Sequence, residues 1–174
     1  HPGMKQWLAR ELARHVGAGR VVANLDVQLP STWLDGLSAS LLGERAVALP
    51  GYRRGHLRWT LHSMLGEPER HGVSDPRVLA YLDPAQGGNE LALRRFQLAD
   101  RLARVFTQYL VYRAEWLRAW EAGKWPFATV SLEDTRLRTL ETQCLAPLWK
   151  AVAASLGEHR GRLVGALVEA LDAR

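Results

Sequence analysis

The chain has 174 residues, 47% of them hydrophobic, so it is long enough to enclose a hydrophobic core. Its net charge of +5 comes far more from arginine than from lysine, which favours phosphate or carboxylate partners that planar guanidinium groups can bind. No apolar run approaches the ~20 residues of a transmembrane helix, and the start lacks a signal-peptide pattern. The single cysteine, Cys144, excludes an internal disulfide and a thiolate metal cluster. We therefore expect a cytoplasmic protein with Cys144 in its core.

The first 29 residues are predicted to form a helix and then a short strand or extended segment. Residues 1–15 place apolar side chains at helical spacing, and we expect Trp7 among the buried ones. Two glycines, at positions 17 and 19, stop that pattern. Residues 21–29 start with two valines and end before a proline, which is typical of a strand. The sequence therefore predicts at most one short strand.

Two further helices are expected before residue 66. Ser31 or Thr32 can cap the first of them, whose inner face would carry Trp33. A loop rich in glycine, proline and arginine follows, and the second helix is expected at about 56–65. Trp59 is its predicted anchor in the core.

The longest helical pattern runs unbroken from Phe96 to Glu121, after a short helix at 76–82 and a turn at 83–89. Its apolar stripe consists of Leu98, Leu102, Val105, Phe106, Tyr109, Tyr112 and Trp116. Its opposite, polar stripe consists of Gln97, Arg101, Arg104 and Gln108. An ordinary solvated helix back explains the polar stripe, and an anionic ligand such as nucleic acid also fits it.

The remainder of the chain is expected to be helical after an irregular segment at 125–134. A helix at about 135–155 should bend or break before Pro147, because a proline disfavours helical backbone in the residue preceding it. A last helix is expected at about 161–173. No repeat, low-complexity tract or long linker divides the chain, so we predict a single, mainly α domain in the form of a helical bundle.

No pattern of catalytic or metal-binding residues stands out. The chain has no GxxxxGK[ST] loop for a nucleoside triphosphate, no HxxxH or HExxH spacing for zinc, and no nucleophile elbow. Its carboxylates are scattered rather than paired as in a two-metal nuclease. These residues predict a binding or scaffolding module with no catalytic residues, no metal site and no cofactor.

Four motifs in a fixed order carry a family resemblance. They are GMKQWL at 3–8, ANLDVQLP at 23–30, FTQYLVYRAEWLRAWE at 106–121 and APLWK at 146–150. Together they resemble the amino-terminal region of RecC, the gamma chain of exodeoxyribonuclease V. The resemblance covers essentially the whole chain, although residues 38–88 are supported only by their helical pattern.

The resemblance implies an inactivated superfamily 1 helicase-like domain, with residues 1–30 at the edge of its 1A-like part and about 31–174 as its helical insertion. The family's first strand-helix-strand would lie upstream, so this sequence would be a fragment. The implied function is that of a non-catalytic subunit in double-strand break repair and recombination in the bacterial cytoplasm. It would hold RecB-like and RecD-like subunits and line the tunnel in which the 3′-ending strand is scanned for Chi.

The residues predicted to bind DNA are Gln6, Leu29, Arg101, Arg104, Gln108 and Arg113. Gln6 and Leu29 come from the family's motifs, with an idle surface glutamine and a packing leucine as the alternatives. Arg113 is a DNA-facing arginine in the family, and an internal salt bridge is its alternative. Arg104 and Thr107 stand where other members can carry acidic residues, so the DNA sequence recognised would differ. A helical protein-protein docking module without direct DNA contact is the alternative function, and a membrane-surface protein fits the sequence least.

Overall fold

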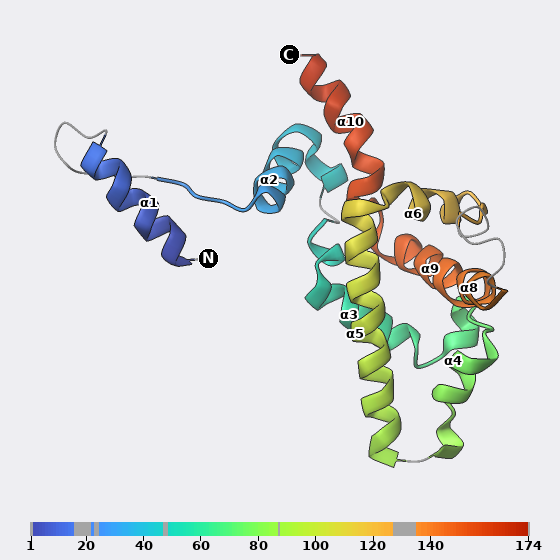
Figure 1. Ribbon diagram of the computed structural model, residues 1–174. Helices are drawn as coiled ribbons and strands as arrows, with labels where there is room; N and C mark the ends of the chain where they lie inside the picture. The colour runs from blue at the N-terminus through green and yellow to red at the C-terminus, as the bar shows by residue number, and fades with distance from the viewer. Residues whose placement is uncertain are drawn as a thin grey trace. The chain divides into compact units, whose positions relative to one another are not determined.

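The computed structural model describes residues 2–15, 22, 25–46, 49–86, 88–126 and 135–173. These residues form helices and irregular segments, and none of them belongs to a strand (Figure 1). The mainly α fold is therefore confirmed. The chain divides into two compact units, His1–Leu37 and Ser38–Arg174.

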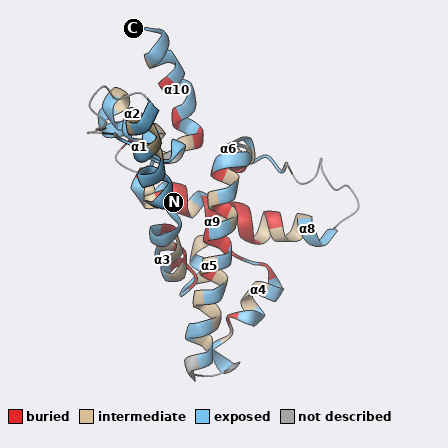
Figure 2. Cartoon of the chain, turned by 60° about the vertical axis from the view of Figure 1, so that its left-hand side comes forward, coloured by how far each residue is buried: buried red, intermediate tan, exposed pale blue. Residues whose placement is uncertain are grey.

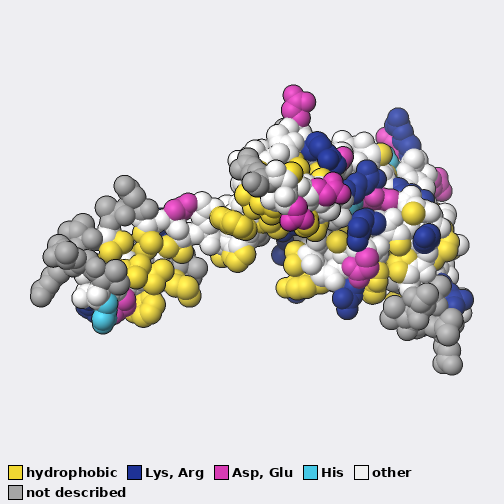
Figure 3. Space-filling view, turned by 90° about the horizontal axis from the view of Figure 1, so that it is seen from above, with side chains coloured by type: hydrophobic (Ala, Val, Ile, Leu, Met, Phe, Trp, Pro, Cys, Tyr) yellow, Lys and Arg dark blue, Asp and Glu magenta, His cyan; other side chains and the backbone are white. Residues whose placement is uncertain are grey.

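The first unit contains α1 (Pro2–His15) and most of α2 (Pro30–Leu42). We expected a strand at 21–29, but the described residues of that segment, 22 and 25–29, form none. A strand needs a second strand to pair with, and none of the described residues provides one. The other residues of that segment lie outside the described ones. Trp7 is 60% exposed, contrary to our expectation, and Figure 3 shows hydrophobic side chains gathered over α1.

Helix α2 begins at Pro30, two residues earlier than a cap at Ser31 would allow. The carbonyl of Leu29 accepts a hydrogen bond from the amide of Trp33 at 3.0 Å, which makes Leu29 the N-cap and places Ser31 and Thr32 inside the first turn. The prediction of a Ser31 or Thr32 cap is therefore wrong. Trp33 is 56% exposed, so it does not lie on an inner face either.

The second unit is a bundle built around the long helix α5. Its helices are α3 (Arg54–Met64), α4 (Pro76–Tyr81), α5 (Gly88–Tyr112), α6 (Ala114–Glu121), α8 (Thr135–Leu140), α9 (Ala146–Leu156) and α10 (Arg160–Asp172). Short 3₁₀ segments connect them, namely η1 (Gly43–Ala46), η2 (Leu49–Tyr52), η3 (Pro68–His71) and η4 (Pro84–Gln86). Helix α3 packs along α5, whereas α6 packs on α9 and α10 (Figure 1).

Figure 2 shows buried segments where α5, α6 and α9 meet, and the side chains of the core at this point are aromatic. The ring of Phe106 lies 5.2 Å from that of Trp149 and 6.4 Å from that of Trp120, and all three side chains are fully buried. Leu57 and Leu61 bring α3 into the same core, whereas Trp59, the predicted anchor of that helix, is 55% exposed. The spacing therefore identified the helix but not its buried face.

The pattern expected to form one helix from Phe96 to Glu121 forms two. Helix α5 starts earlier, at Gly88, and ends at Tyr112, and the backbone of Arg113 leaves the helical region with φ −145° and ψ 40°. The break redirects the chain so that Leu117 and Trp120 of α6 become buried. Tyr112 lies at the break and is 72% exposed, so it does not belong to the buried stripe.

Before Pro147, where a bend or break was expected, the regular α-helix is interrupted. Between α8 and α9 the chain forms a π-helical segment, η5 (Glu141–Leu145). Pro147 has no amide hydrogen to donate to the carbonyl four residues earlier, that of Gln143. That carbonyl instead accepts hydrogen bonds from the amides of Ser74 and Asp75 at 2.7 and 3.2 Å. The proline thus leaves a backbone acceptor that fixes the segment before α4.

Candidate nucleic-acid interface

The four residues of the polar stripe all lie exposed on α5, as the sequence predicted. They follow each other at steps of four, three and four residues, so they form one row along a length of roughly 16 Å. Two neighbouring cations, Arg101 and Arg104, are flanked by the amides of Gln97 and Gln108. The row combines groups that bind phosphate with groups that can donate to and accept from base edges.

The two arginines of the stripe are not engaged by acidic side chains in the described part of the chain. Other arginines nearby are engaged, since Arg54 and Arg58 approach the carboxylate of Asp100 at 2.6 and 3.6 Å. The hydrogen bond from Arg54 lowers the pKa of Asp100, which therefore stays ionised but neutralised by its partners. The acid adjoining the stripe thus does not cancel the charge of Arg101 and Arg104.

Thr107 and Arg113 lie outside this row. The hydroxyl of Thr107 donates to the backbone carbonyl of Ala103 at 2.8 Å, so it is directed at its own helix. Arg113 is exposed at the break between α5 and α6, where its Nη1 donates to the carbonyl of Tyr112 at 3.0 Å. Its guanidinium also lies 5.5 Å from the ring centre of Trp116. No carboxylate among the described residues forms an ion pair with Arg113, so the salt-bridge alternative has no support.

Gln6 and Leu29 belong to the first unit and are both exposed. Gln6 lies on α1, and Leu29, 65% exposed, precedes α2. The stripe itself is therefore formed by residues of the second unit only. The roles of Gln6 and Leu29 in binding DNA remain predictions from the family resemblance.

A polar cluster that the sequence did not reveal joins α6, α9 and α10. The carboxylate of Glu121, at the end of α6, accepts hydrogen bonds from Nε1 of Trp149 at 2.8 Å, Nε2 of His159 at 2.7 Å and Nε of Arg162 at 2.7 Å. Burial opposes ionisation, but the bonds from His159, Arg162 and Trp149 lower the pKa of Glu121 to about 2. Because the donors are 28 to 41 residues away, no local spacing could have indicated the cluster.

Tyr52 closes the other side of this cluster. Its hydroxyl donates to the carbonyl of Gly157, and its ring packs edge-on against His159 at 5.8 Å. Burial raises the pKa of Tyr52 above its usual range, so the hydroxyl remains a donor at any physiological pH. The cluster thus fixes α10 to the bundle and has the character of a structural network.

Cys144 is buried as expected, and burial raises the pKa of its thiol to about 12. Among the residues that the structure describes, no group of three or more histidine, cysteine, aspartate and glutamate side chains could hold a metal ion. None of the described helices is both long and apolar enough to span a membrane.

Comparison with known proteins identifies the family. The family model described as RecC, N-terminal domain, matches residues 1–174. The RecBCD enzyme subunit RecC of Escherichia coli K12 is 30% identical over 98% of this chain, and that of Haemophilus influenzae is 34% identical over 71%. The matched segments make up 14% and 10% of the two relatives, so the chain spans a small part of their length. No solved structure matches the chain significantly.

Proposed function

Because this chain belongs to the RecC N-terminal domain family, we propose that it is a non-catalytic, DNA-contacting part of a RecC-type subunit. The subunit would work with RecB-like and RecD-like partners in a bacterial, cytoplasmic helicase-nuclease of the exodeoxyribonuclease V type. Its role would be in double-strand break repair and recombination. Residues 1–30 would belong to an inactivated helicase-like domain, and residues 31–174 to its helical insertion.

The observation that carries the DNA contact is the exposed polar stripe of α5. Arg101 and Arg104 would bind the phosphates of a single strand that a motor partner pulls along the helix. Gln97 and Gln108 would contact base edges as they pass. Gln6, Leu29 and Arg113 would add contacts in the tunnel where the strand is scanned for Chi. Most of the binding energy would come from phosphate contacts, with sequence preference from the amides and from Arg104.

Exposed apolar side chains favour a second function, the docking of a partner subunit. On α10, Val164, Val168 and Leu171 follow helical spacing and are 47–51% exposed. On α1, Met4 and Trp7 are at least 60% exposed. Such rows on a soluble surface are typical of faces that another protein surface covers. This scaffold role is compatible with DNA contact along α5, because it uses different residues.

The test measures the affinity of the assembled enzyme for a single-stranded oligonucleotide over a range of salt concentrations. Removing one phosphate contact flattens the logarithmic salt dependence by about 0.7 for single strands. We therefore expect the double variant Arg101→Ala/Arg104→Ala to bind more weakly and with a slope flatter by about 1.4. Subunit assembly, checked by size-exclusion chromatography, should not change.

A control removes one cation of η3, Arg70, which lies near a different side of α5. Arg70 lines a hollow together with Arg95, which lies two residues from Gln97 and so about 160° away around the helix. Arg70→Ala should leave both affinity and slope unchanged. If the double variant binds like the wild type at every salt concentration, DNA contact along α5 is refuted and the docking function remains.

A further inference from the structure

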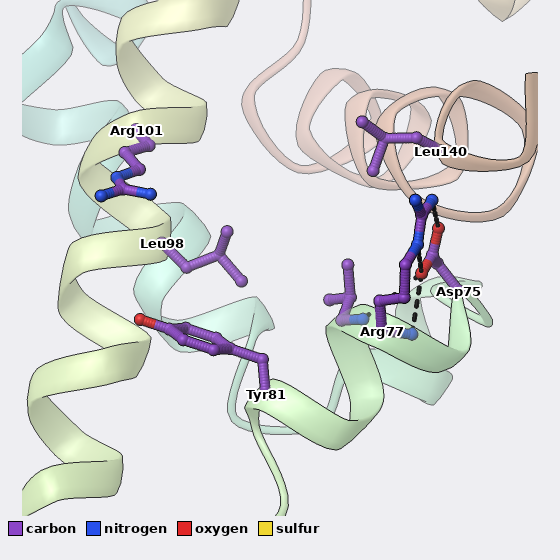
Figure 4. A pocket seen from close by; sticks show the side chains of 7 residues that line it. Asp75, Arg77, Tyr81, Leu98, Arg101 and Leu140 are labelled. Atoms are coloured by element: carbon purple, nitrogen blue, oxygen red, sulfur yellow. Dashed lines mark hydrogen bonds and ion pairs between the residues drawn. The ribbon is translucent and has the colours of Figure 1, made fainter. Parts of the chain in front are cut away.

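A pocket opens beside the polar stripe, where α4, α5 and α8 converge (Figure 4). Its volume is about 280 Å³. It is lined by Asp75, Arg77, Val78, Tyr81, Leu98, Arg101 and Leu140. Arg101 belongs to both the stripe and the pocket, so a strand held along the stripe would pass the mouth of the pocket.

The walls of the pocket are mostly apolar. Leu98 of α5 and the ring of Tyr81 from α4 form one side, and Leu140 of α8 lies across from them (Figure 4). The hydroxyl of Tyr81 is 3.4 Å from Oε1 of Gln97, a stripe residue, and can donate to it. The ring is thereby held next to the stripe with its apolar part facing the cavity.

The charges around the pocket favour an anion at its mouth. Asp75 is fully buried, and its carboxylate accepts from Nη2 of Arg77 at 2.7 Å and from the Arg77 amide at 2.9 Å. The acid is thus already neutralised and occupied as the N-cap of α4. Arg101 is exposed and has no acidic partner among the described residues, so its charge is available to a ligand.

We propose that the pocket receives one unstacked base of the passing single strand while Arg101 binds the adjoining phosphate. This inference rests on the proposed function. A flat, uncharged base suits an apolar cavity with an aromatic wall, because every base has a π-face that can stack on a tyrosine ring. The volume is just below the range of about 300–1,000 Å³ for small-ligand sites, which suits one base rather than a stack of several.

The pocket would give the passing strand one fixed binding position on the surface of α5. A strand that slides over Arg101 and Arg104 would lodge a base beside Tyr81 at each step, so the pocket would set the register in which the following bases meet Gln108. Stacking does not depend on base identity, and the pocket would therefore hold any base.

The test is a thermodynamic cycle on the assembled enzyme without nucleotide, so that the strand does not move. The DNA is a duplex whose end fixes the register of a single-stranded oligo(dT) tail, and the tail carries one abasic site at successive positions. For the wild type, one position should weaken binding by roughly five- to tenfold, the lower range of one base stacked on an aromatic side chain. Tyr81→Ala should weaken binding to intact oligo(dT) by the same factor. When Tyr81→Ala is tested with the abasic site at that position, the affinity should fall no further than with either change alone, because both changes remove the same contact.

Controls separate the failure of this inference from that of the proposed function. Tyr112→Ala removes another exposed tyrosine of the bundle, at the far end of α5, and should leave the abasic-site dependence of the wild type intact. If the losses of affinity from Tyr81→Ala and from the abasic site add up at every position of that site, the base pocket is refuted. This holds even if Arg101→Ala/Arg104→Ala still weakens DNA binding. If Tyr81→Ala instead lowers subunit assembly with DNA affinity unchanged, the pocket holds a protein side chain and the inference is wrong. Unchanged binding by the arginine variant would refute the proposed function itself.

Discussion

Nε2 of His159 lies 2.7 Å from Oε1 of Glu121, and this bond joins the start of α10 to the end of α6. The other ring nitrogen of His159, Nδ1, accepts from the amide of Gly161 at 3.1 Å. Because an amide can only donate, Nδ1 acts as the acceptor and Nε2 is left to donate to Glu121. One imidazole therefore both caps α10 and binds the carboxylate that holds Trp149 and Arg162.

Removing the carboxylate of Glu121 should destabilise the bundle. Glu121→Ala leaves Nε1 of Trp149 and Nε2 of His159 buried without their acceptor, and each lost partner costs about 1–3 kcal/mol. We expect the free energy of unfolding to fall by about 2–5 kcal/mol, measured by urea denaturation. The exposed Glu169 on α10 provides the control, since Glu169→Ala should change stability by at most about 0.5 kcal/mol. Equal effects of the two variants would mean that the cluster does not stabilise the fold.

The same carboxylate should make stability depend on pH in the acid range. Its pKa is about 2 in the folded chain against 4.5 for an ordinary glutamate. A carboxylate with a lowered pKa contributes stability that is fully present above about pH 4.5 and is lost as the pH falls towards 2. The loss is roughly 3 kcal/mol at 1.36 kcal/mol for each unit of pKa. Unfolding curves of the wild type and Glu121→Gln should converge over this window, and a constant difference between them would contradict the assignment.

Two glycines should respond in opposite ways to alanine. Gly72 has φ 77°, and an added Cβ would lie 3.1 Å from Cβ of Pro147, so Gly72→Ala should lower stability by about 1–2 kcal/mol. Gly165 is inside α10 with open space around it, so Gly165→Ala should raise stability by up to about 1 kcal/mol. Thermal unfolding of both variants distinguishes the cases. A stabilising Gly72→Ala would show that the turn before α4 tolerates a side chain.

Arg104 should contribute a preference for guanine, because a guanidinium can donate two hydrogen bonds to O6 and N7 of that base. Arg104→Gln keeps hydrogen bonding but lacks the planar fork and the charge. The variant should lose the gain in affinity that a single guanine in oligo(dT) gives at the facing position. Arg70→Gln, on another side of the bundle, should retain that gain. A guanine preference that survives in Arg104→Gln would assign base reading to other residues.

The sequence predicted the polar stripe correctly because four residues at helical spacing share a face whatever surrounds them. It did not predict the break at Arg113, where arginine is itself a good helix former. That break follows from the packing of α6 on α9, a contact between segments far apart in the chain. The Glu121 cluster and the pocket beside Tyr81 were missed for the same reason, since each needs three separate helices.

Exposed tryptophans mark the other limit of prediction from sequence. Trp7, Trp33 and Trp59 were all expected to be buried from their spacing, yet each is at least 55% exposed. Hydrophobic periodicity identifies a face that avoids water but not the surface that covers it. For a segment that spans a small part of its relatives' length, a covering surface need not belong to the same segment.

Contact between the stripe of α5 and the moving strand is tested most directly by site-specific crosslinking. A photoreactive p-benzoylphenylalanine replaces Gln108 in the assembled enzyme, and a second preparation carries it in place of Arg70. Illumination during unwinding should join the residue at position 108 to the single strand, with no product from position 70. Equal yields at the two positions, or no DNA product from position 108, would contradict a DNA-contacting role for this helix.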